Sequence, residues 1–207
     1  MANSNIRCEL TILLLFVTVI YRNYCNRGGK MYPFFRLIKT IVLSRKEKLT
    51  YLSQDSMTFR CRPWDIDIFM EMNNGRMITL FDLGRFSLIS KCGLLPVLLK
   101  NKWAVVVAGS SIMYRKRIRM FDKVTMYTRV VGIDKKWVYL EQSMWVKGKP
   151  CCSMTIRTAV TCKGGLVATE EVIEAFGNGA EILPPEEWLS NWIENEEGRC
   201  WPPHVEQ

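Results

Sequence analysis

Two carboxylates and a pair of asparagines stand close together in the first half of the chain. Asp65 and Asp67 are followed by Asn73, Asn74 and Gly75, and a long apolar segment begins directly after them. Asn is a favoured helix N-cap, because its side-chain oxygen accepts a hydrogen bond from a free amide of the first turn. The start of a helix also carries a partial positive charge and can polarise a carbonyl group. A carboxylate beside such a helix end is suited to acyl transfer, although the same residues also serve as ordinary loop and helix caps.

The surrounding sequence predicts the elements that hold these residues. Apolar side chains cover more than half of the circumference of a helix that runs from the asparagines to Lys91, before Gly93. One strand is predicted before this helix, because apolar and polar residues alternate around residues 57–61. Four more strands are predicted after it, within 103–119, 124–130, 138–146 and 154–162. Short turns between them favour an antiparallel sheet. The expected fold is α+β, a single domain whose antiparallel sheet curls around the central helix.

The motif resembles that of the hotdog-fold acyl-CoA thioesterases, the relatives of 4-hydroxybenzoyl-CoA thioesterase. In that family an Asp is followed by three residues, His, one residue, two Asn, a small residue and Arg. The matching residues here are Asp67, Asn73, Asn74, Gly75 and Arg76, and further matches are Pro63, Arg85-Phe86, Cys92-Gly93, Leu183-Pro184-Pro185-Glu186 and Trp192-Ile193. The resemblance covers roughly residues 32 to 198. It implies a single hotdog domain, a homodimer with the ligand site between protomers, and a fatty acyl-CoA thioester as substrate or ligand, with no other cofactor.

The resemblance also implies roles for the matching residues. Asp67 takes the place of the catalytic carboxylate, which attacks the thioester carbonyl or activates a water molecule. Amides near Asn73, Asn74 and Gly75 would stabilise the oxyanion. Within this set, Asn73 is expected to cap the helix and Asn74 to orient the water or the carbonyl group.

The chain departs from the family at one position, where Glu71 replaces the His. With Asp65 and Asp67 nearby, this extra carboxylate should raise at least one pKa through like-charge repulsion, which would either retune or abolish the site. Two functions therefore stay open. One is an acyl-CoA thioesterase, and the other is a catalytically inactive acyl-binding, lipid-binding or scaffold protein.

The basic residues suggest where the phosphates of coenzyme A would bind. The 207-residue chain has a net charge of +9, and Arg115, Lys116 and Arg117 form one basic cluster. Arg grips phosphate with two hydrogen bonds, although alternating charge on a strand surface explains the cluster equally well. No recognised nucleic-acid motif is present, so no nucleic-acid partner is expected. The eight Cys form no Cys-x-x-Cys pair and the single His is His204, so no metal site is expected.

The N-terminal region, residues 1–50, is predicted to form an anchor separate from the domain at 51–207. Residues 10–21 are uncharged and mostly apolar, and 32–43 form a basic amphipathic segment suited to a membrane interface. The basic residues after the apolar segment place the C-terminal side in the cytosol. We therefore expect membrane contact through residues 6–43, reduced cysteines, and the endoplasmic reticulum membrane that the resemblance implies. A secreted protein after signal-peptide cleavage is the alternative.

Two short helices are predicted near the C-terminus, at 170–176 and 186–195. Trp188 and Trp192 would lie four residues apart on one face of the second helix and dock on the sheet or on a partner.

Overall fold

The protein is described by a computed structural model that covers residues 33–44, 47–177, 179–200 and 202–203. Its centre is a sheet of six strands, β1 Asp55–Arg60, β2 Ala104–Tyr114, β3 Lys123–Ile133, β4 Val138–Val146, β5 Lys149–Cys162 and β6 Gly165–Val167. The strands follow the order β1-β3-β4-β5-β2, β6 pairs with β5, and every pair is antiparallel. The predicted antiparallel sheet is therefore confirmed.

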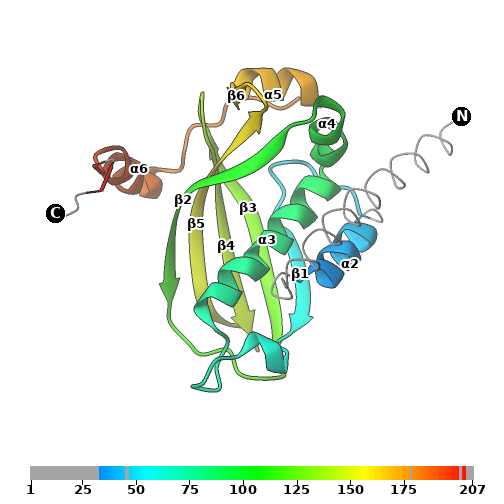
Figure 1. The fold of residues 1–207 in the computed structure, drawn as a ribbon, viewed down its shortest axis with the longest axis vertical. Coiled ribbons are helices and arrows are strands. Elements are labelled where there is room, and N and C mark those ends of the chain that lie inside the picture. The colour runs from blue at the N-terminus through cyan, green and yellow to red at the C-terminus, as the bar shows by residue number, and fades with distance from the viewer. Residues whose placement is uncertain (1–32, 45–46, 178, 201, 204–207) are drawn as a thin grey trace, which may run out of the picture.

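The helices are α2 Phe34–Ser44, α3 Asn74–Lys91, α4 Leu94–Asn101, α5 Thr169–Phe176 and α6 Ser190–Glu197, with 3-10 turns at Pro63–Asp65 and Glu187–Leu189. Helix α3 lies across one face of the curved sheet, α2 lies beside α3, and α4 and α5 gather at one end of the sheet (Figure 1). The predicted central helix between the first and second strands is thus present, and it starts and ends where the sequence indicated.

A glycine lets α3 approach the sheet closely. A Cβ atom at Gly84 would lie 2.6 Å from Thr128 Oγ1 and 2.8 Å from Met126 Cε, so no larger side chain fits without a shift. Gln142 crosses this contact, and its Nε2 donates to Phe81 O and to Thr128 Oγ1, both at 2.9 Å. The buried amide is therefore satisfied, which keeps its burial from being costly.

Helix α2 packs on the domain with one face. Leu37 and Ile41 belong to the same buried cluster as the inner side chains of α3 and the sheet. Phe35, Val42 and Leu43 are exposed. The membrane contact expected for this segment stays a prediction, as does the domain boundary near residue 50.

Other parts of the N- and C-terminal predictions lie outside the described residues, namely the apolar segment at 6–24 and His204. In the part of the chain that is described, no helix has the length and apolar character needed to cross a membrane.

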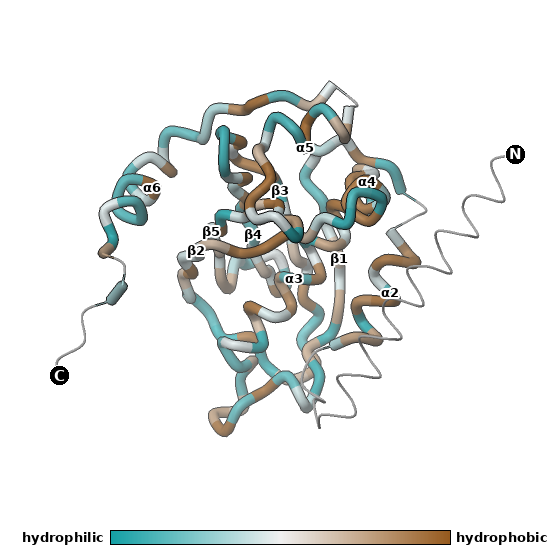
Figure 2. The backbone as a smooth tube through the Cα atoms, turned by 45° about the horizontal axis from the view of Figure 1, so that its top comes forward, coloured by the Kyte–Doolittle hydropathy of each residue, from teal (hydrophilic) through white to brown (hydrophobic). Residues whose placement is uncertain are grey.

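Two elements were not predicted, α4 and the short strand β6. Helix α4 follows Gly93, whose φ of +86° turns the chain sharply after α3. Its apolar residues are not periodic, and Pro96 interrupts the run, so the sequence shows no clear helical pattern. In Figure 2, α4 is hydrophobic over most of its length, whereas α6 is mostly hydrophilic. The long predicted strand within 103–119 ends at Tyr114, and its register shifts between Val107 and Gly109, as the expected kink requires.

Of the two tryptophans predicted to dock on the sheet or on a partner, only Trp192 packs on the sheet, and docking of Trp188 on a partner stays a prediction. Trp192 packs with Tyr139 and Leu189 against β3 and β4. Trp188 is 49% exposed, and its Nε1 donates to Glu186 Oε2 at 2.6 Å. The reason is that Trp188 belongs to the 3-10 turn before α6, where three residues complete a turn, so the four-residue spacing of an α-helix does not apply.

Candidate active site

Asp67 lies in a tight hairpin that leads directly into α3. Asn73 N donates to Asp65 O at 2.9 Å, and Asp67 N donates to Glu71 O at 2.9 Å. Met70, in the turn between them, has a φ of +60°. Asp67 therefore stands at the closed end of the hairpin opposite Glu71, whereas Asp65 stands at the end where the helix begins.

The two carboxylates have different surroundings. Asp65 is 1% exposed, and its carboxylate contacts Arg36 Nη2 at 2.7 Å and Arg76 Nε at 3.3 Å. It also accepts the backbone N–H of Arg62 at 2.9 Å, so it joins α2, the 3-10 turn and α3. A carboxylate held in this way has a structural role, because it links these three elements to one another.

Asp67 is only half-buried. Its Oδ1 accepts the backbone N–H of Phe69 at 2.8 Å, and no Lys or Arg of the described residues forms an ion pair with it. Of the two aspartates before α3, Asp67 is therefore the one whose carboxylate is available to a ligand.

The first turn of α3 is capped by both asparagines. Asn73 Oδ1 accepts the N–H of Arg76 at 3.1 Å, so the predicted N-cap is confirmed. Asn74 Oδ1 accepts the N–H of Gly75 at 2.6 Å. Both Asn side chains are exposed. A carbonyl oxygen would reach one of these amides by displacing the Asn oxygen that now occupies it.

Glu71, the residue at the family's His position, is paired with a basic residue. Arg117 Nε lies 2.9 Å from Glu71 Oε2, and Glu71 also forms a backbone bridge with Arg119. The loop after β2 thus runs alongside the hairpin. Arg117 and the partners of Asp65 place positive charge near these carboxylates, and the like-charge repulsion predicted around Asp67 stays a prediction.

The three predicted phosphate ligands occupy this same loop. Arg115, Lys116 and Arg117 are all exposed, and the backbone N–H groups of the first two donate to Cys151 O at 2.8 and 3.0 Å. Asp67, Glu71 and the basic loop are therefore brought to one end of α3, as the sequence suggested, while their catalytic and binding roles stay predictions. Within the described ranges, no three His, Cys, Asp or Glu side chains gather into a metal-binding group.

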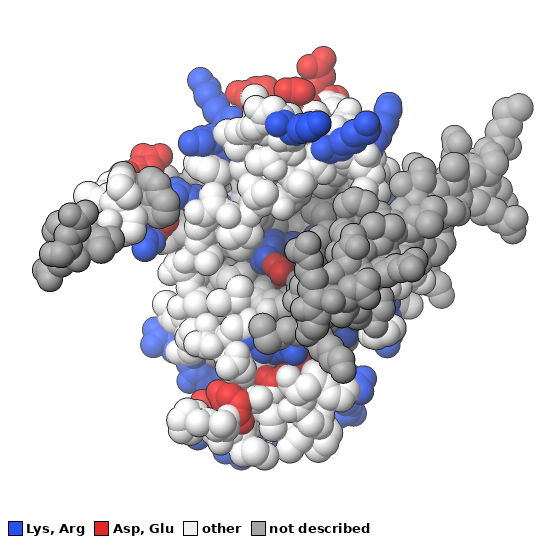
Figure 3. All heavy atoms as spheres, in the orientation of Figure 1, with Lys and Arg blue, Asp and Glu red and all other residues white. Residues whose placement is uncertain are grey.

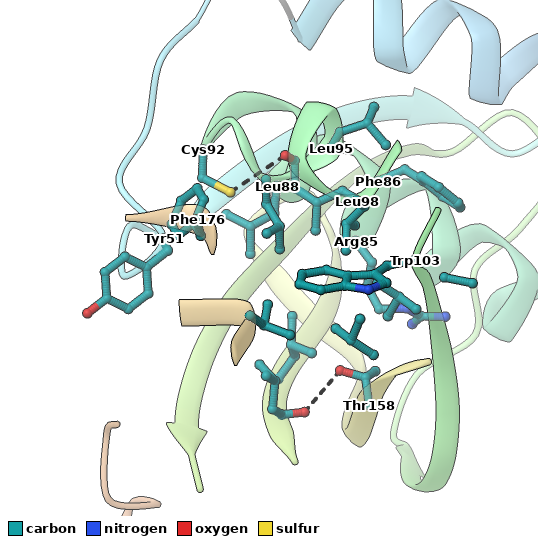
Figure 4. A pocket seen from close by; sticks show the side chains of 18 of the residues that line it. Tyr51, Arg85, Phe86, Leu88, Cys92, Leu95, Leu98, Trp103, Thr158 and Phe176 are labelled. Carbon is teal, nitrogen blue, oxygen red and sulfur yellow. Dashed lines mark hydrogen bonds between the residues drawn. The ribbon is translucent and has the colours of Figure 1, made fainter. Parts of the chain in front are cut away.

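A large apolar pocket lies along the other half of α3. Its volume is about 580 Å³, and its walls come from α2, α3, α4, α5 and four strands. Figure 4 shows Leu88, Leu95, Leu98, Trp103 and Phe176 among the lining side chains. Asp67 and the capping residues of α3 are not part of its wall. The pocket and the hairpin are therefore two distinct features of the same helix.

Two charged residues line this pocket among the described residues, Asp82 and Arg85. Figure 3 shows basic and acidic atoms inside a hollow on this face of the molecule. Asp82 Oδ1 pairs with Arg85 Nη2, and Arg85 Nη1 donates to Gln142 Oε1 at 2.6 Å. Burial raises the pKa of Asp82, and the positive charge of Arg85 opposes this shift. Our sequence analysis missed the pair, although charges three residues apart inside an apolar helix are the signal that could have revealed it.

The fold and the hairpin together define a thioesterase-like protein. The Thioesterase-like superfamily matches residues 61–193, and the chain belongs to this family. The predicted relationship to the hotdog-fold thioesterases is thereby confirmed.

The motifs also resemble the animal protein called thioesterase superfamily member six. In agreement, Protein THEM6 of Drosophila melanogaster is 30% identical over 140 residues, which cover 64% of this chain and 66% of the relative. Probable thioesterase YBR096W of Saccharomyces cerevisiae is 24% identical over 136 residues, covering 64% of this chain and 59% of the relative. The chain therefore spans less than two thirds of either relative.

Solved structures show the same fold. The DHNA-CoA thioesterase from Staphylococcus aureus superimposes with a TM-score of 0.54 over 71% of this chain and 96% of its own, at 16% sequence identity. At that identity the likeness concerns the arrangement of the sheet and helices.

Proposed function

We propose that the protein hydrolyses fatty acyl-CoA thioesters at the start of α3, with Asp67 as the reactive carboxylate. The observation that carries this proposal is that Asp65 and Asp67, two neighbouring aspartates, differ in burial and in ion pairing. Asp65 is buried and bound by Arg36 and Arg76, whereas Asp67 is half-buried and has no such partner among the described residues. Family membership supports the reaction class, and the yeast relative is named a probable thioesterase.

The proposed reaction uses groups that are already in place. Asp67 takes a proton from water while the water oxygen bonds to the thioester carbonyl carbon. Amides of the first turn of α3, at Gly75 and Arg76, stabilise the oxyanion after an Asn side chain moves aside. The carbon–sulfur bond then breaks, and Asp67 returns its proton to the coenzyme A sulfur. Direct attack by Asp67 to form an anhydride, followed by hydrolysis, is the alternative route.

Coenzyme A would lie over the basic loop. Arg115 and Lys116 are exposed next to the hairpin and suit the phosphates. A homodimer is part of the proposal, because β2 is an edge strand and exposes Val105, Val106 and Val107. An unpaired edge of this kind invites a second strand. We further propose that the protein works at the endoplasmic reticulum membrane, held there by residues 6–43.

A catalytically inactive acyl-binding protein is the second candidate. Two observations favour it. Glu71 occupies the place of the family His and is paired with Arg117, and the Gly75 and Arg76 amides are both engaged by Asn side chains. In this case the same surface would bind an acyl thioester without cleaving it.

Thiol release separates the two candidates. The full chain in lipid nanodiscs is supplied with acyl-CoAs of increasing length, and Asp67→Asn is compared with the wild type. Loss of at least about 100-fold in turnover is expected for the variant, since a positioned acid or base contributes that much. Glu174→Gln, a change of an exposed carboxylate on α5, serves as the matched control and should leave turnover unchanged. Retained acyl-CoA binding without thiol release from any member of the panel would favour the inactive protein.

A further inference from the structure

One face of α3 connects its first turn with the pocket. Gly75 and Asp82 are seven residues apart, so they lie on the same face, separated by about 10 Å along the helix axis. Ile78 and Thr79 lie between them on this face, and Ile78 is 40% exposed. A chain that starts at Gly75 can therefore follow an accessible stripe of the helix toward Asp82.

The charged pair stands at the near end of the pocket. On α3 the pocket is lined by Asp82, Arg85 and Phe86 and then by residues nearer the C-terminal end of the helix, up to Ile89, followed by the C-cap residue Cys92. Asp82 and Arg85 are thus met first by a ligand that approaches from the start of α3. The apolar remainder of the pocket continues toward α4 and α5, where Leu95 is one of the lining residues.

The chemistry of the pair selects one kind of ligand group. A carboxylate only accepts hydrogen bonds and a guanidinium only donates them, so a hydroxyl group, which does both, can add a hydrogen bond to the existing Asp82–Arg85 ion pair from either side. A ligand carboxylate would be repelled by Asp82, and an ammonium group by Arg85. A plain alkyl chain would displace water from the Asp82 side chain, which is 32% exposed, and would give it no hydrogen bond in return, which is unfavourable. Because the pair is neutral overall, a neutral partner fits it best.

We propose that Asp82 and Arg85 recognise a hydroxyl group on the acyl chain, roughly eight carbons from the thioester carbonyl. The substrate class would then be a mid-chain hydroxylated acyl thioester, whose carbonyl lies at the start of α3 and whose distal carbons fill the apolar pocket. This inference rests on the proposed function, since the carbonyl position at Gly75 sets the distance to Asp82.

Binding of non-hydrolysable analogues tests the inference without any turnover. The full chain in lipid nanodiscs is titrated with thioether analogues of dodecanoyl-CoA that are plain, 3-hydroxylated or 8-hydroxylated. The 8-hydroxy analogue should bind about tenfold more tightly than the plain one, as expected for a hydrogen bond to a charged group, and the 3-hydroxy analogue should bind like the plain one. Partitioning into the nanodisc is the same for wild type and variants, so it does not affect the comparison between them.

Variants locate the source of this preference. Asp82→Leu should remove it, and Asp82→Asn, which keeps the shape of the side chain, should reduce it. Leu95→Ala is the matched control in the same pocket and should weaken all three analogues by the same factor. The inference is overturned if the wild type binds plain and 8-hydroxy analogues equally, if it binds neither, or if the preference survives in Asp82→Leu.

The outcome is distinguishable from that of the proposed function. Asp67-dependent thiol release without a hydroxyl preference would uphold hydrolysis and refute the recognition site. A hydroxyl preference that depends on Asp82, with no thiol release from any acyl-CoA, would uphold the recognition site and refute hydrolysis.

Discussion

The two halves of α3 offer a ligand opposite environments. At the first turn, the exposed Asn73 and Asn74 and the half-buried Asp67 present polar groups beside a basic loop. Along the C-terminal half, an apolar pocket of about 580 Å³ is interrupted by the Asp82–Arg85 pair. The first region has the groups that we propose polarise and hydrolyse a thioester, and none of them lines the apolar pocket. The second has the volume for an aliphatic chain but lies away from Asp67. The proposed hydrolysis and the proposed binding of the acyl chain therefore take place at different halves of the same helix.

The same contrast exists within the first region, where Asp65 is a buried ion-pair partner and Asp67 is the proposed reactive carboxylate. Replacing Asp65 by Asn should lower the free energy of unfolding by about 3 kcal/mol, because it leaves Arg36 and Arg76 as half-buried charges without their shared carboxylate. Urea denaturation of the full chain measures the change. Asp67→Asn keeps the oxygen that accepts the Phe69 amide, so it should change stability by less than about 0.5 kcal/mol. Equal losses in both variants would contradict the separation of roles.

A second prediction concerns the contact that places both halves of α3 against the sheet. Gly84→Ala should cost about 2 kcal/mol of stability, because its Cβ would clash with Thr128 and Met126. Gly164→Ala is the control, since its Cβ would find its nearest neighbour, Cys162 Sγ, at 3.7 Å. Denaturation curves of the two variants give the comparison. A Gly84→Ala protein with unchanged stability would show that α3 can move away from the sheet without lowering the free energy of unfolding.

The smallest effect is expected at the C-terminal end of α3, where Lys91 is bound by two carboxylates. Lys91 Nζ lies 2.7 Å from Asp55 Oδ1 and 2.6 Å from Glu47 Oε2. Burial disfavours the ammonium, but the hydrogen bonds and negative charges of these partners outweigh it and raise the pKa of Lys91 above its usual 10.5. The folded state therefore holds this proton more tightly than the unfolded chain.

This contribution to stability is fully present below pH 10.5 and is lost as the pH rises through the folded-state pKa. The stability difference between wild type and Lys91→Met should accordingly be constant at neutral and mildly alkaline pH and shrink above pH 10.5. A pH series of urea denaturation experiments measures it. A difference that grows with pH would show that the paired ammonium does not stabilise the fold.

Much of the fold was predictable from local patterns. Period-two alternation located the strands, and the long apolar segment after Asn74 located the central helix with its cap at Asn73. Helix α4 was not predicted, because its short apolar segment contains Pro96 and its apolar residues show no helical periodicity. Trp188 does not dock on the sheet as Trp192 does, since a 3-10 turn replaces the first turn of the predicted helix.

The site was predictable only in part. The motif identified Asp65, Asp67 and Glu71 as neighbours, but it could not say which carboxylate is bound by arginines. That depends on Arg36, which lies 29 residues before Asp65 in sequence. The basic loop was expected to bind phosphate, and its pairing of Arg117 with Glu71 came only from the structure.

The sequence by itself determined which elements form and which residues gather at the start of α3, because caps, turns and alternation act over a few residues. Only the tertiary structure decided that Asp65 is buried and bound by two arginines, that Asp67 is accessible, and that Asp82 and Arg85 border a pocket. These properties arise from packing between α2, α3, α4, α5 and the sheet, that is, from contacts between residues far apart in the chain. Burial and charge pairing depend on such distant contacts, so no local sequence pattern predicts them.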